Sequence, residues 1–170
     1  MADGRLLEDL AEAAREAGEA ILAIVRRGFD VEAKPDRSPV TEADRAAEKV
    51  ILAAIARAAG GVPVIAEEEV AAGRIPHHGD TYFLVDPLDG TKEFVRGGDD
   101  YTVNIGLIEG GTPKLGVVFA PATGTLHAGV VGVGGWVDRG QGRVPIRTRA
   151  RYCMWIELSA KEQRRRQPDR

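Results

Sequence analysis

The sequence has a single cysteine, no long hydrophobic run and no basic leader segment. Cys153 has no second cysteine with which to form an internal disulfide, a usage typical of the reducing cytoplasm. No apolar run approaches the roughly 20 residues that a membrane-spanning helix needs. The N-terminal MADGRLLEDL is acidic and amphipathic, whereas a signal peptide begins with basic residues followed by an apolar stretch. We therefore expect a cytoplasmic chain with no integral membrane insertion.

An excess of positive charge is also absent. The 170 residues include 23 Lys and Arg against 26 Asp and Glu, a formal net charge of -3. Basic residues gather in the last twenty positions, so the rest of the chain is the more acidic part. Nucleic-acid binding relies on clustered Lys and Arg, and an acidic body therefore argues against a nucleic-acid partner. Clustered carboxylates can instead hold divalent cations.

Two segments have the apolar spacing of helices. Leucine, isoleucine and alanine recur at helical intervals over residues 5–27, and Gly28 follows as a C-cap. A second helix is predicted to begin near Thr41 or Asp44 and to end at Gly60. The length of the chain suits one domain.

Short apolar segments bounded by turn residues follow the second helix. They predict strands over 62–66, 81–86, 101–108, 114–120, 125–131, 134–138 and 143–148. The short turns between them favour antiparallel pairing. We expect an α+β fold in which the helix pair packs on a mainly antiparallel sheet, formed by residues 1–150. Residues 151–170 lack these signals and are expected to form a poorly ordered basic tail.

The segment LVDPLDGTKEF, residues 84–94, carries the most chemical information. Asp86 ends a predicted strand, and Pro87 is expected to stop that strand. Asp89 lies three residues after Asp86, so both carboxylates can point into one cavity. The carbonyl of Leu88 between them is a third hard oxygen, of the kind that binds divalent cations.

The turn after Asp89 offers donors for an anion. Gly90 and Thr91 would present backbone N–H groups at a turn, or at the start of a helical turn that continues into 92–94, and such groups suit a phosphate oxygen. The same residues are also typical of a strand followed by an ordinary β-turn. For this segment alone the two interpretations stay open.

Two further acidic segments lie at the edges of predicted elements. Glu67, Glu68 and Glu69 follow the strand over 62–66, although three adjacent acids are also typical of a solvated loop. The segment SPVTEAD (38–44) precedes the second helix and can be explained as an N-cap. Taken with Asp86 and Asp89, these acidic elements favour a site for a hard cation.

Four segments resemble the inositol monophosphatase superfamily of magnesium-dependent, lithium-sensitive phosphatases. Within it the chain is most similar to the CysQ-type 3'(2'),5'-bisphosphate nucleotidases. The resemblance covers roughly residues 5–149, and a DPLDGT motif preceded by an EE element is highly specific. Lys92-Glu93-Phe94 follows this motif, where inositol-directed members more often have Thr-Asn-Phe or Thr-Asn-Tyr. The segments are SPVTEAD (38–44), VIAEEE (64–69), LVDPLDGTKEF (84–94) and YTVNIGLIEGGTPKLGVVFAPATGTLHAG (101–129).

The resemblance implies a two-metal site. Glu67, Asp86 and the Leu88 carbonyl would hold one Mg²⁺, and Asp86 would bridge to a second ion that Asp89 also holds. The catalytic pair would be Thr91 and Asp44, with Glu67 helping to orient the attacking water. The implied substrate-binding set is Glu67, Leu88, Asp89, Gly90, Thr91 and Lys92.

The activity implied is hydrolysis of 3'-phosphoadenosine 5'-phosphate to AMP and phosphate by metal-activated water, in sulfate assimilation. The partner is then a small phosphorylated nucleotide. The Gly90 and Thr91 amides would receive its scissile phosphate, and Lys92 could meet a second phosphate or simply be a surface lysine. Two alternatives stay open. One is an inositol-1-phosphate phosphatase, and the other is a non-catalytic metal-binding fragment.

The sequence departs from the family pattern toward its C-terminal end. Family members have a later Trp-Asp-x-Ala-Ala-Gly motif whose Asp completes the second metal site. Here Trp136 is followed by Val137, and Trp155 by Ile156. We therefore expect a truncated fold with an under-coordinated second metal and low or no activity. Strand edges exposed by truncation would favour a homodimer or aggregation.

Overall fold

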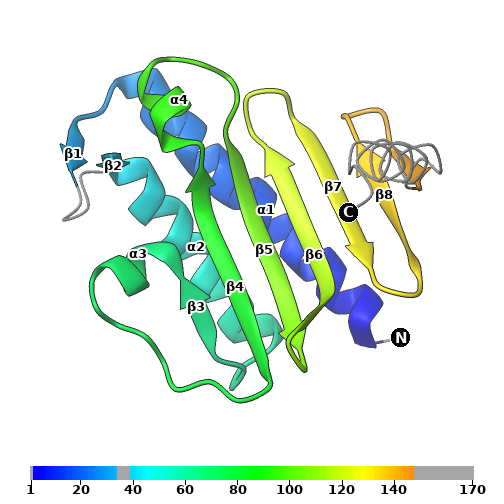
Figure 1. Cartoon of the computed structure of the whole chain (residues 1–170). Helices are drawn as coiled ribbons and strands as arrows, with labels where there is room; N and C mark the ends of the chain where they lie inside the picture. The colour runs from blue at the N-terminus through cyan, green and yellow to red at the C-terminus, as the bar shows by residue number, and fades with distance from the viewer. Residues whose placement is uncertain (1, 34–38, 148–170) are drawn as a thin grey trace, which may run out of the picture.

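Two long helices cover one face of a seven-stranded sheet (Figure 1). The structure is a computed structural model and describes residues 2–33 and 39–147. Both predicted helices are confirmed, as α1 (Ala2–Arg27) and α2 (Glu42–Ala58). Gly28 has a positive φ of 80° and its N–H donates to the carbonyl of Val25, so α1 ends where a glycine permits the left-handed turn.

The sheet has the order β3-β4-β5-β6-β7-β8-β9, so strands that are consecutive in sequence are neighbours in space. Only β3 and β4 pair in parallel among these, and the remaining pairs are antiparallel, which confirms the mainly antiparallel α+β fold. The strands are β3 (Val64–Ala66), β4 (Thr81–Asp89), β5 (Thr102–Glu109), β6 (Thr112–Ala120), β7 (Thr125–Val130), β8 (Gly134–Asp138) and β9 (Arg143–Ile146).

Alternation along the central strands separates two faces of the sheet. Phe83 and Val85 on β4 are buried with the side chains of α1 and α2 in one hydrophobic core. Leu84 and Asp86 alternate with them and therefore point to the opposite face, which the long helices leave uncovered (Figure 1). The carboxylate of Asp86 thus lies on the face that α1 and α2 leave uncovered, which is called the helix-free face below.

Strand β4 does not stop at Pro87, contrary to the sequence prediction. It continues to Asp89, with an irregularity between the Asp86–Asn104 and Asp89–Thr102 pairs of the β4–β5 ladder. One extra residue of β4 is accommodated there, which is a β-bulge. Because proline has no N–H to give to a ladder, the strand tolerates Pro87 only at such an interruption.

The structure contains four short elements that the sequence did not predict or predicted only as one alternative. A hairpin of β1 (Val31–Ala33) and β2 (Pro39–Thr41) connects α1 to α2. The three acids begin a helical turn, α3 (Glu67–Ala71), where a solvated loop was the alternative. The predicted helical turn after the DPLDGT motif is confirmed as α4 (Thr91–Val95).

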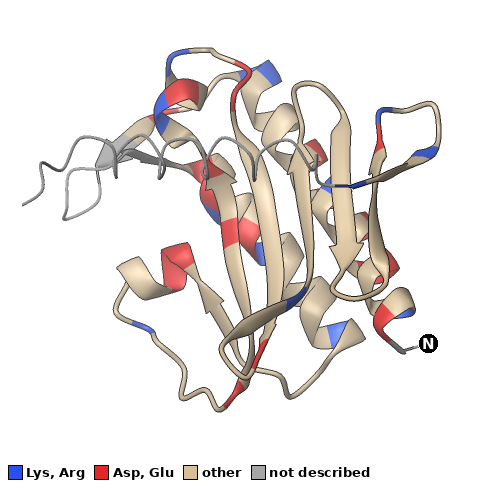
Figure 2. Ribbon diagram, turned by 45° about the vertical axis from the view of Figure 1, so that its right-hand side comes forward, with Lys and Arg blue, Asp and Glu red and all other residues tan. Residues whose placement is uncertain are grey.

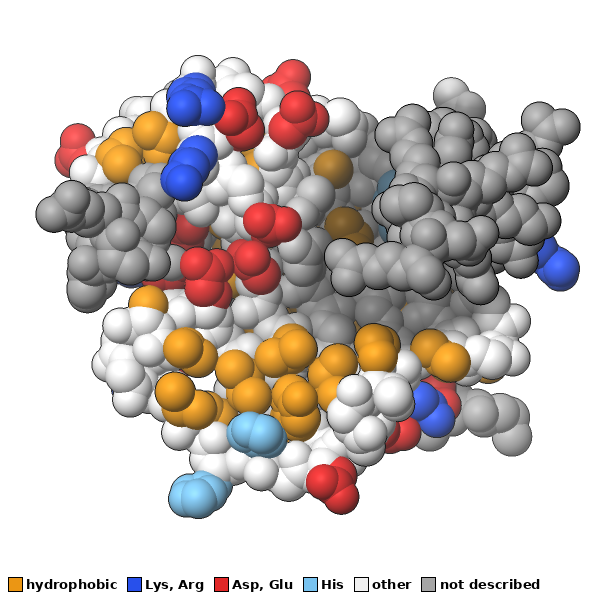
Figure 3. Space-filling view, in the orientation of Figure 1, with side chains coloured by type: hydrophobic (Ala, Val, Ile, Leu, Met, Phe, Trp, Pro, Cys, Tyr) orange, Lys and Arg blue, Asp and Glu red, His pale blue; other side chains and the backbone are white. Residues whose placement is uncertain are grey.

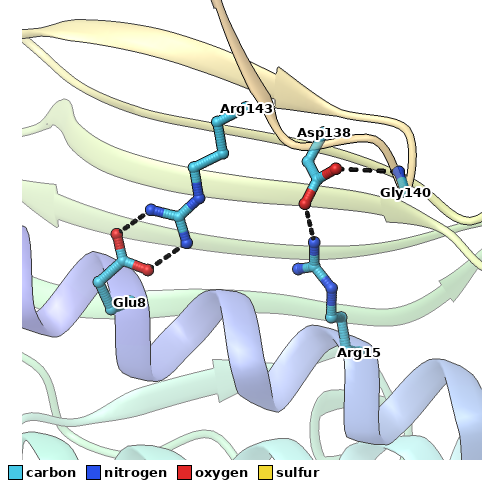
Figure 4. A network of polar contacts seen from close by, with 5 residues as sticks. All are labelled: Glu8, Arg15, Asp138, Gly140 and Arg143. Atoms are coloured by element: carbon cyan, nitrogen blue, oxygen red, sulfur yellow. Dashed lines mark hydrogen bonds and ion pairs between the residues drawn. The ribbon is translucent and has the colours of Figure 1, made fainter.

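Ion pairs connect the far end of the sheet to α1 (Figure 4). Arg15 on α1 bonds Asp138 of β8 at 2.7 Å, and Asp138 also accepts from the amide of Gly140. Glu8 forms a bidentate pair with Arg143 of β9, whose guanidinium lies 3.9 Å from the ring centroid of Trp136. The β8–β9 hairpin is therefore held against the helix by charged as well as ladder contacts.

Within residues 2–33 and 39–147, no helix is long and apolar enough to cross a membrane. Cys153 and the predicted tail, 151–170, lie outside the described residues, as does Ser38. The assignment of 151–170 as a separate basic tail therefore stays a prediction.

Helix α1 contains two glycines in opposite surroundings, which gives a matched test of its packing. A Cβ on Gly18 would lie 2.3 Å from a ring carbon of Phe119 on β6, whereas a Cβ on Gly4 would meet nothing within 4 Å. Alanine is favoured over glycine in a helix by about 1 kcal/mol, but overpacking costs about 1–3 kcal/mol. We expect Gly18→Ala to lower the free energy of unfolding by roughly 1–2 kcal/mol, measured by urea denaturation.

Gly4→Ala is the control and is expected to leave the free energy of unfolding unchanged or to raise it by up to about 1 kcal/mol. Equal stabilisation by both substitutions would mean that α1 does not approach β6 closely at Gly18.

Candidate active site

The parallel pairing of β3 and β4 brings two carboxylates together. Ala66, the last residue of β3, is paired with Val85 of β4. The next residues along the two strands are Glu67 and Asp86, and these side chains form a hydrogen bond. Figure 2 shows acidic positions on α3 and beside it on the sheet.

Asp86 has an unusually high pKa. Burial, the hydrogen bond to Glu67 and the charges of Glu67 and Asp89 raise this pKa from 3.8 to about 7. The amide of Leu88, which donates to Asp86 Oδ1 at 3.2 Å, acts in the opposite direction. The ionised form of Asp86 is disfavoured because its neighbours are also acidic and because burial removes part of the hydration of the carboxylate.

Asp89 lies at the other side of the β-bulge, at an exposed position. Its Oδ2 is 3.4 Å from Nδ2 of Asn104, which pairs with Asp86 in the β4–β5 ladder. Sequence reasoning did not identify Asn104 as a site residue. Its place in the strand alternation, on the same face as Asp86, is the signal that would have found it.

Asp44 uses its two carboxylate oxygens for different purposes. Oδ2 accepts from the amide and the hydroxyl of Thr41, at 2.7 and 2.8 Å, and completes a capping box at the start of α2. Oδ1 is 3.3 Å from the hydroxyl of Thr91, forty-seven residues later. The N-cap interpretation of the sequence is therefore confirmed, and the same side chain also reaches α4.

Gly90 permits the turn that places Thr91. Its φ is 91°, and a Cβ at this position would lie 2.5 Å from the carbonyl oxygen of Asp100. A side chain is thus excluded both by conformation and by space. The hydroxyl of Thr91 then reaches the Leu88 carbonyl at 2.9 Å, so the bulge and α4 are connected by a hydrogen bond.

Helix α4 is anchored by one aromatic side chain. Phe94 is buried, stacks on Phe29 with ring centroids 4.6 Å apart, and meets Tyr101 edge-on at 5.1 Å. Lys92, on the same short helix, is exposed. The anchoring fixes Thr91 while it leaves Lys92 facing solvent.

The predicted residues thus form two adjoining groups. In the first group, Glu67 and Asp86 contact each other, and Asp89 lies near them. In the second, Thr91 connects Asp44 to Leu88. In the described part of the chain, no three His, Cys, Asp or Glu side chains are close enough together to hold a metal ion by themselves. The carboxylates therefore form a pair with a peripheral third acid.

This donor set still suits Mg²⁺. The ion typically takes one or two carboxylates and completes its shell with water and phosphate oxygens. Glu67, Asp86, Asp89 and the Leu88 carbonyl offer only hard oxygens. The hydrogen bond between Glu67 and Asp86 requires a proton on one of the two carboxyl groups. The raised pKa of Asp86 indicates that the ionised groups repel one another, and a cation would relieve this repulsion.

An apolar hollow adjoins the carboxylates on the helix-free face. It has a volume of about 500 Å³, and Glu67 and Asp86 line it together with Leu84 and Val118. Figure 3 shows acidic side chains gathered beside a broad hydrophobic patch on this face. Charged chemistry and apolar contact are therefore available side by side.

Comparison with known proteins gives a consistent result. The inositol monophosphatase family matches residues 5–168. The chain is 42% identical over 129 residues to the 3'(2'),5'-bisphosphate nucleotidase CysQ of Shigella flexneri, covering 75% of this chain and 52% of that protein. Its structure resembles CysQ from Bacteroides thetaiotaomicron, with a TM-score of 0.62, 33% identity and coverage of 88% and 55% of the two chains.

An inositol monophosphatase from Anabaena is also similar, with a TM-score of 0.71 at 28% identity, covering 88% of this chain and 52% of that one. The chain thus spans about half the length of these relatives.

The raised pKa of Asp86 predicts a pH dependence of stability in metal-free protein. The folded state holds a proton on Asp86 that the unfolded state releases at lower pH. The stabilisation from this group is therefore complete below about pH 4 and is lost as the pH rises to about 7. We expect Asp86→Asn to gain stability relative to the unmodified chain over this range, measured by urea midpoints in EDTA at several pH values.

Asp80→Asn is the control, because it removes a carboxylate from an exposed position just before β4. Its urea midpoints measure the effect of losing a carboxylate outside the site. If the difference between Asp86→Asn and the unmodified chain did not change with pH, Asp86 would not have the raised pKa.

Proposed function

Because the chain belongs to the inositol monophosphatase family, we propose that it is a Mg²⁺-dependent phosphomonoesterase that hydrolyses 3'-phosphoadenosine 5'-phosphate to AMP and phosphate. The observation that carries the proposal is that Leu88 connects the two pairs. Its amide donates to Asp86, the partner of Glu67, and its carbonyl accepts from Thr91, whose hydroxyl also lies 3.3 Å from Asp44. A cation can neutralise a phosphate ester and acidify water, and a hydroxyl–carboxylate pair can accept the proton of that water. The activity of the whole relatives is thereby proposed for a chain of about half their length.

Glu67, Asp86, Asp89 and the Leu88 carbonyl are the groups proposed to hold Mg²⁺. Bound there, the ion would neutralise the anionic phosphate oxygens and make water more acidic. Asp89, like Glu67, is exposed, and its hydrogen bond with Asn104 supports its orientation toward Asp86.

Thr91 and Asp44 are proposed to handle the proton of the attacking water. Thr41 fixes Oδ2 of Asp44, and Oδ1 therefore remains directed at the Thr91 hydroxyl. Thr91 can accept a proton from water at Oγ1 while its own proton passes to Asp44. Its single hydroxyl proton serves one acceptor at a time, so donation to Asp44 releases the Leu88 carbonyl for use as a ligand.

The substrate is proposed to bind through the turn after the bulge. The amides of Gly90 and Thr91 would receive the scissile phosphate, and the exposed Lys92 is available to a second phosphate of the nucleotide. The 42% identity to a bisphosphate nucleotidase supports this substrate. The structural likeness to an inositol monophosphatase keeps inositol-1-phosphate as the second candidate.

The direct test is phosphate release from 3'-phosphoadenosine 5'-phosphate, with inositol-1-phosphate in parallel. We expect low activity on the nucleotide, because the sequence has no Trp-Asp pair to complete the second metal site. This activity should require Mg²⁺ and stop in EDTA, because the acidic site needs a cation to admit an anionic substrate. Preference for inositol-1-phosphate would replace the substrate assignment. If neither is hydrolysed, a Mg²⁺-induced rise in melting temperature that Asp86→Asn abolishes would identify a non-catalytic metal-binding fragment.

A second prediction separates the hydroxyl of Thr91 from its packing. Thr91→Ala removes the group that bonds Asp44, and general acid–base assistance contributes about 10²–10⁴-fold. We expect kcat to fall by about this factor, with Mg²⁺ affinity nearly unchanged. Thr91→Ser retains the hydroxyl and should keep most of the activity. Equal activity of the Ala and Ser variants would exclude Thr91 from proton transfer.

A further inference from the structure

Helix α3 begins without a capping side chain at its N-cap position. The residue at its N-cap is Ala66, which has no side chain able to accept a hydrogen bond from the first turn. The turn that follows consists of three acidic residues, Glu67, Glu68 and Glu69. The first amides of a helix have no partner within the helix and need acceptors from elsewhere.

Glu48 of α2 supplies that acceptor from a different helix. Its Oε2 lies 3.0 Å from the amide nitrogen of Glu68, which donates to it. The residue is only 5% exposed, in a helix whose other buried members are mostly alanine and isoleucine. A buried carboxylate in such a position is unfavourable unless hydrogen bonds compensate it.

Two opposing influences act on Glu48. Burial raises its pKa, and the charges of Glu68 and Glu69 add to this effect. Hydrogen bonding to the amides of Glu68 and Glu69 lowers the pKa. The net effect is a raised pKa, and the carboxylate faces the start of α3 through its hydrogen bond with the Glu68 amide.

These contacts define the position of Glu67 from both sides. Before it, Ala66 is fully buried and paired with Val85 in the parallel ladder. After it, the Glu68 amide is bound to Glu48. The backbone of Glu67 therefore lies between two fixed points, while its own side chain reaches Asp86.

We propose that Glu48 is a positioning residue, which caps α3 from the neighbouring helix and thereby holds Glu67 beside Asp86. The capping part of this inference concerns only the metal-free chain. The consequence for Mg²⁺ binding rests on the proposed function. No contact of Glu48 with substrate or cation is implied.

The experiment compares Glu48→Ala and Glu48→Gln with Glu42→Gln in the full chain. Alanine removes the acceptor, and glutamine keeps an oxygen acceptor without the charge. Glu42 is an exposed residue of the same helix that pairs with Arg27 at the surface, so Glu42→Gln is the matched control. Should Glu48→Ala fail to fold, Glu48→Gln carries the comparison.

The first measurement is amide hydrogen exchange of residues 67–71 in metal-free protein. Glu48→Ala should accelerate exchange of the Glu68 amide at least about tenfold, Glu48→Gln less, and Glu42→Gln not at all. Unchanged exchange in a folded Glu48→Ala or, if that variant does not fold, in Glu48→Gln would overturn the proposal. This result does not depend on whether the chain binds a cation or hydrolyses a phosphate ester.

The second measurement is the dissociation constant for Mg²⁺, by calorimetry at a temperature where every variant is folded. Residues that orient metal ligands typically change affinity by about 10–100-fold, and we expect this weakening for Glu48→Ala. Because glutamine keeps the oxygen acceptor, Glu48→Gln should weaken Mg²⁺ binding less than Glu48→Ala does, a partial rescue that loss of the charge alone would not produce. An unchanged dissociation constant would overturn the positioning role.

If the unmodified chain binds no Mg²⁺, the proposed function fails. The exchange measurement then still decides whether Glu48 caps α3.

Discussion

The parallel pairing of β3 with β4 is the constraint on which the rest of the site depends. Every other pair in the seven-stranded sheet is antiparallel, so only here do two strands run side by side toward the same edge. Glu67 and Asp86 follow directly from the Ala66–Val85 pair and must therefore be neighbours. A shift of one residue in this register would move Asp86 away from Glu67, and the contact between the two carboxyl groups would be lost.

Holding several acids together is unfavourable, and the structure compensates each one differently. Asp44 is 1% exposed, and a capping box satisfies one of its oxygens. Glu48 is nearly as buried and binds an amide at the start of α3. Asp86 accepts from the amide of Leu88, but burial and the neighbouring acids Glu67 and Asp89 raise its pKa to about 7. Asp44 and Glu48 thus support the backbone, whereas Asp86 lies among other acids that a cation would neutralise.

Much of the fold could be predicted from the sequence because its signals are local. Helical apolar spacing and short strands between turns gave both long helices and the mainly antiparallel sheet. The same local rules misjudged Pro87, since a bulge lets β4 continue past it. The N-cap at the start of α2 was local and predictable, but the bond of Asp44 to Thr91 depends on tertiary packing. Glu48 gave no signal, because an acid on a helix is ordinary until the fold buries it.

The apolar hollow affects the strength of the electrostatic interactions between the charges beside it. Leu84 and Val118, each 43% exposed, line the same hollow as Glu67 and Asp86. A surface packed over these side chains would exclude water from the carboxylates and lower the local dielectric. The repulsion between the carboxylates of Glu67 and Asp86 and their attraction for a cation would then both become stronger. The affinity of the site for the proposed Mg²⁺ would therefore depend on what covers this face, even where no new metal ligand is added.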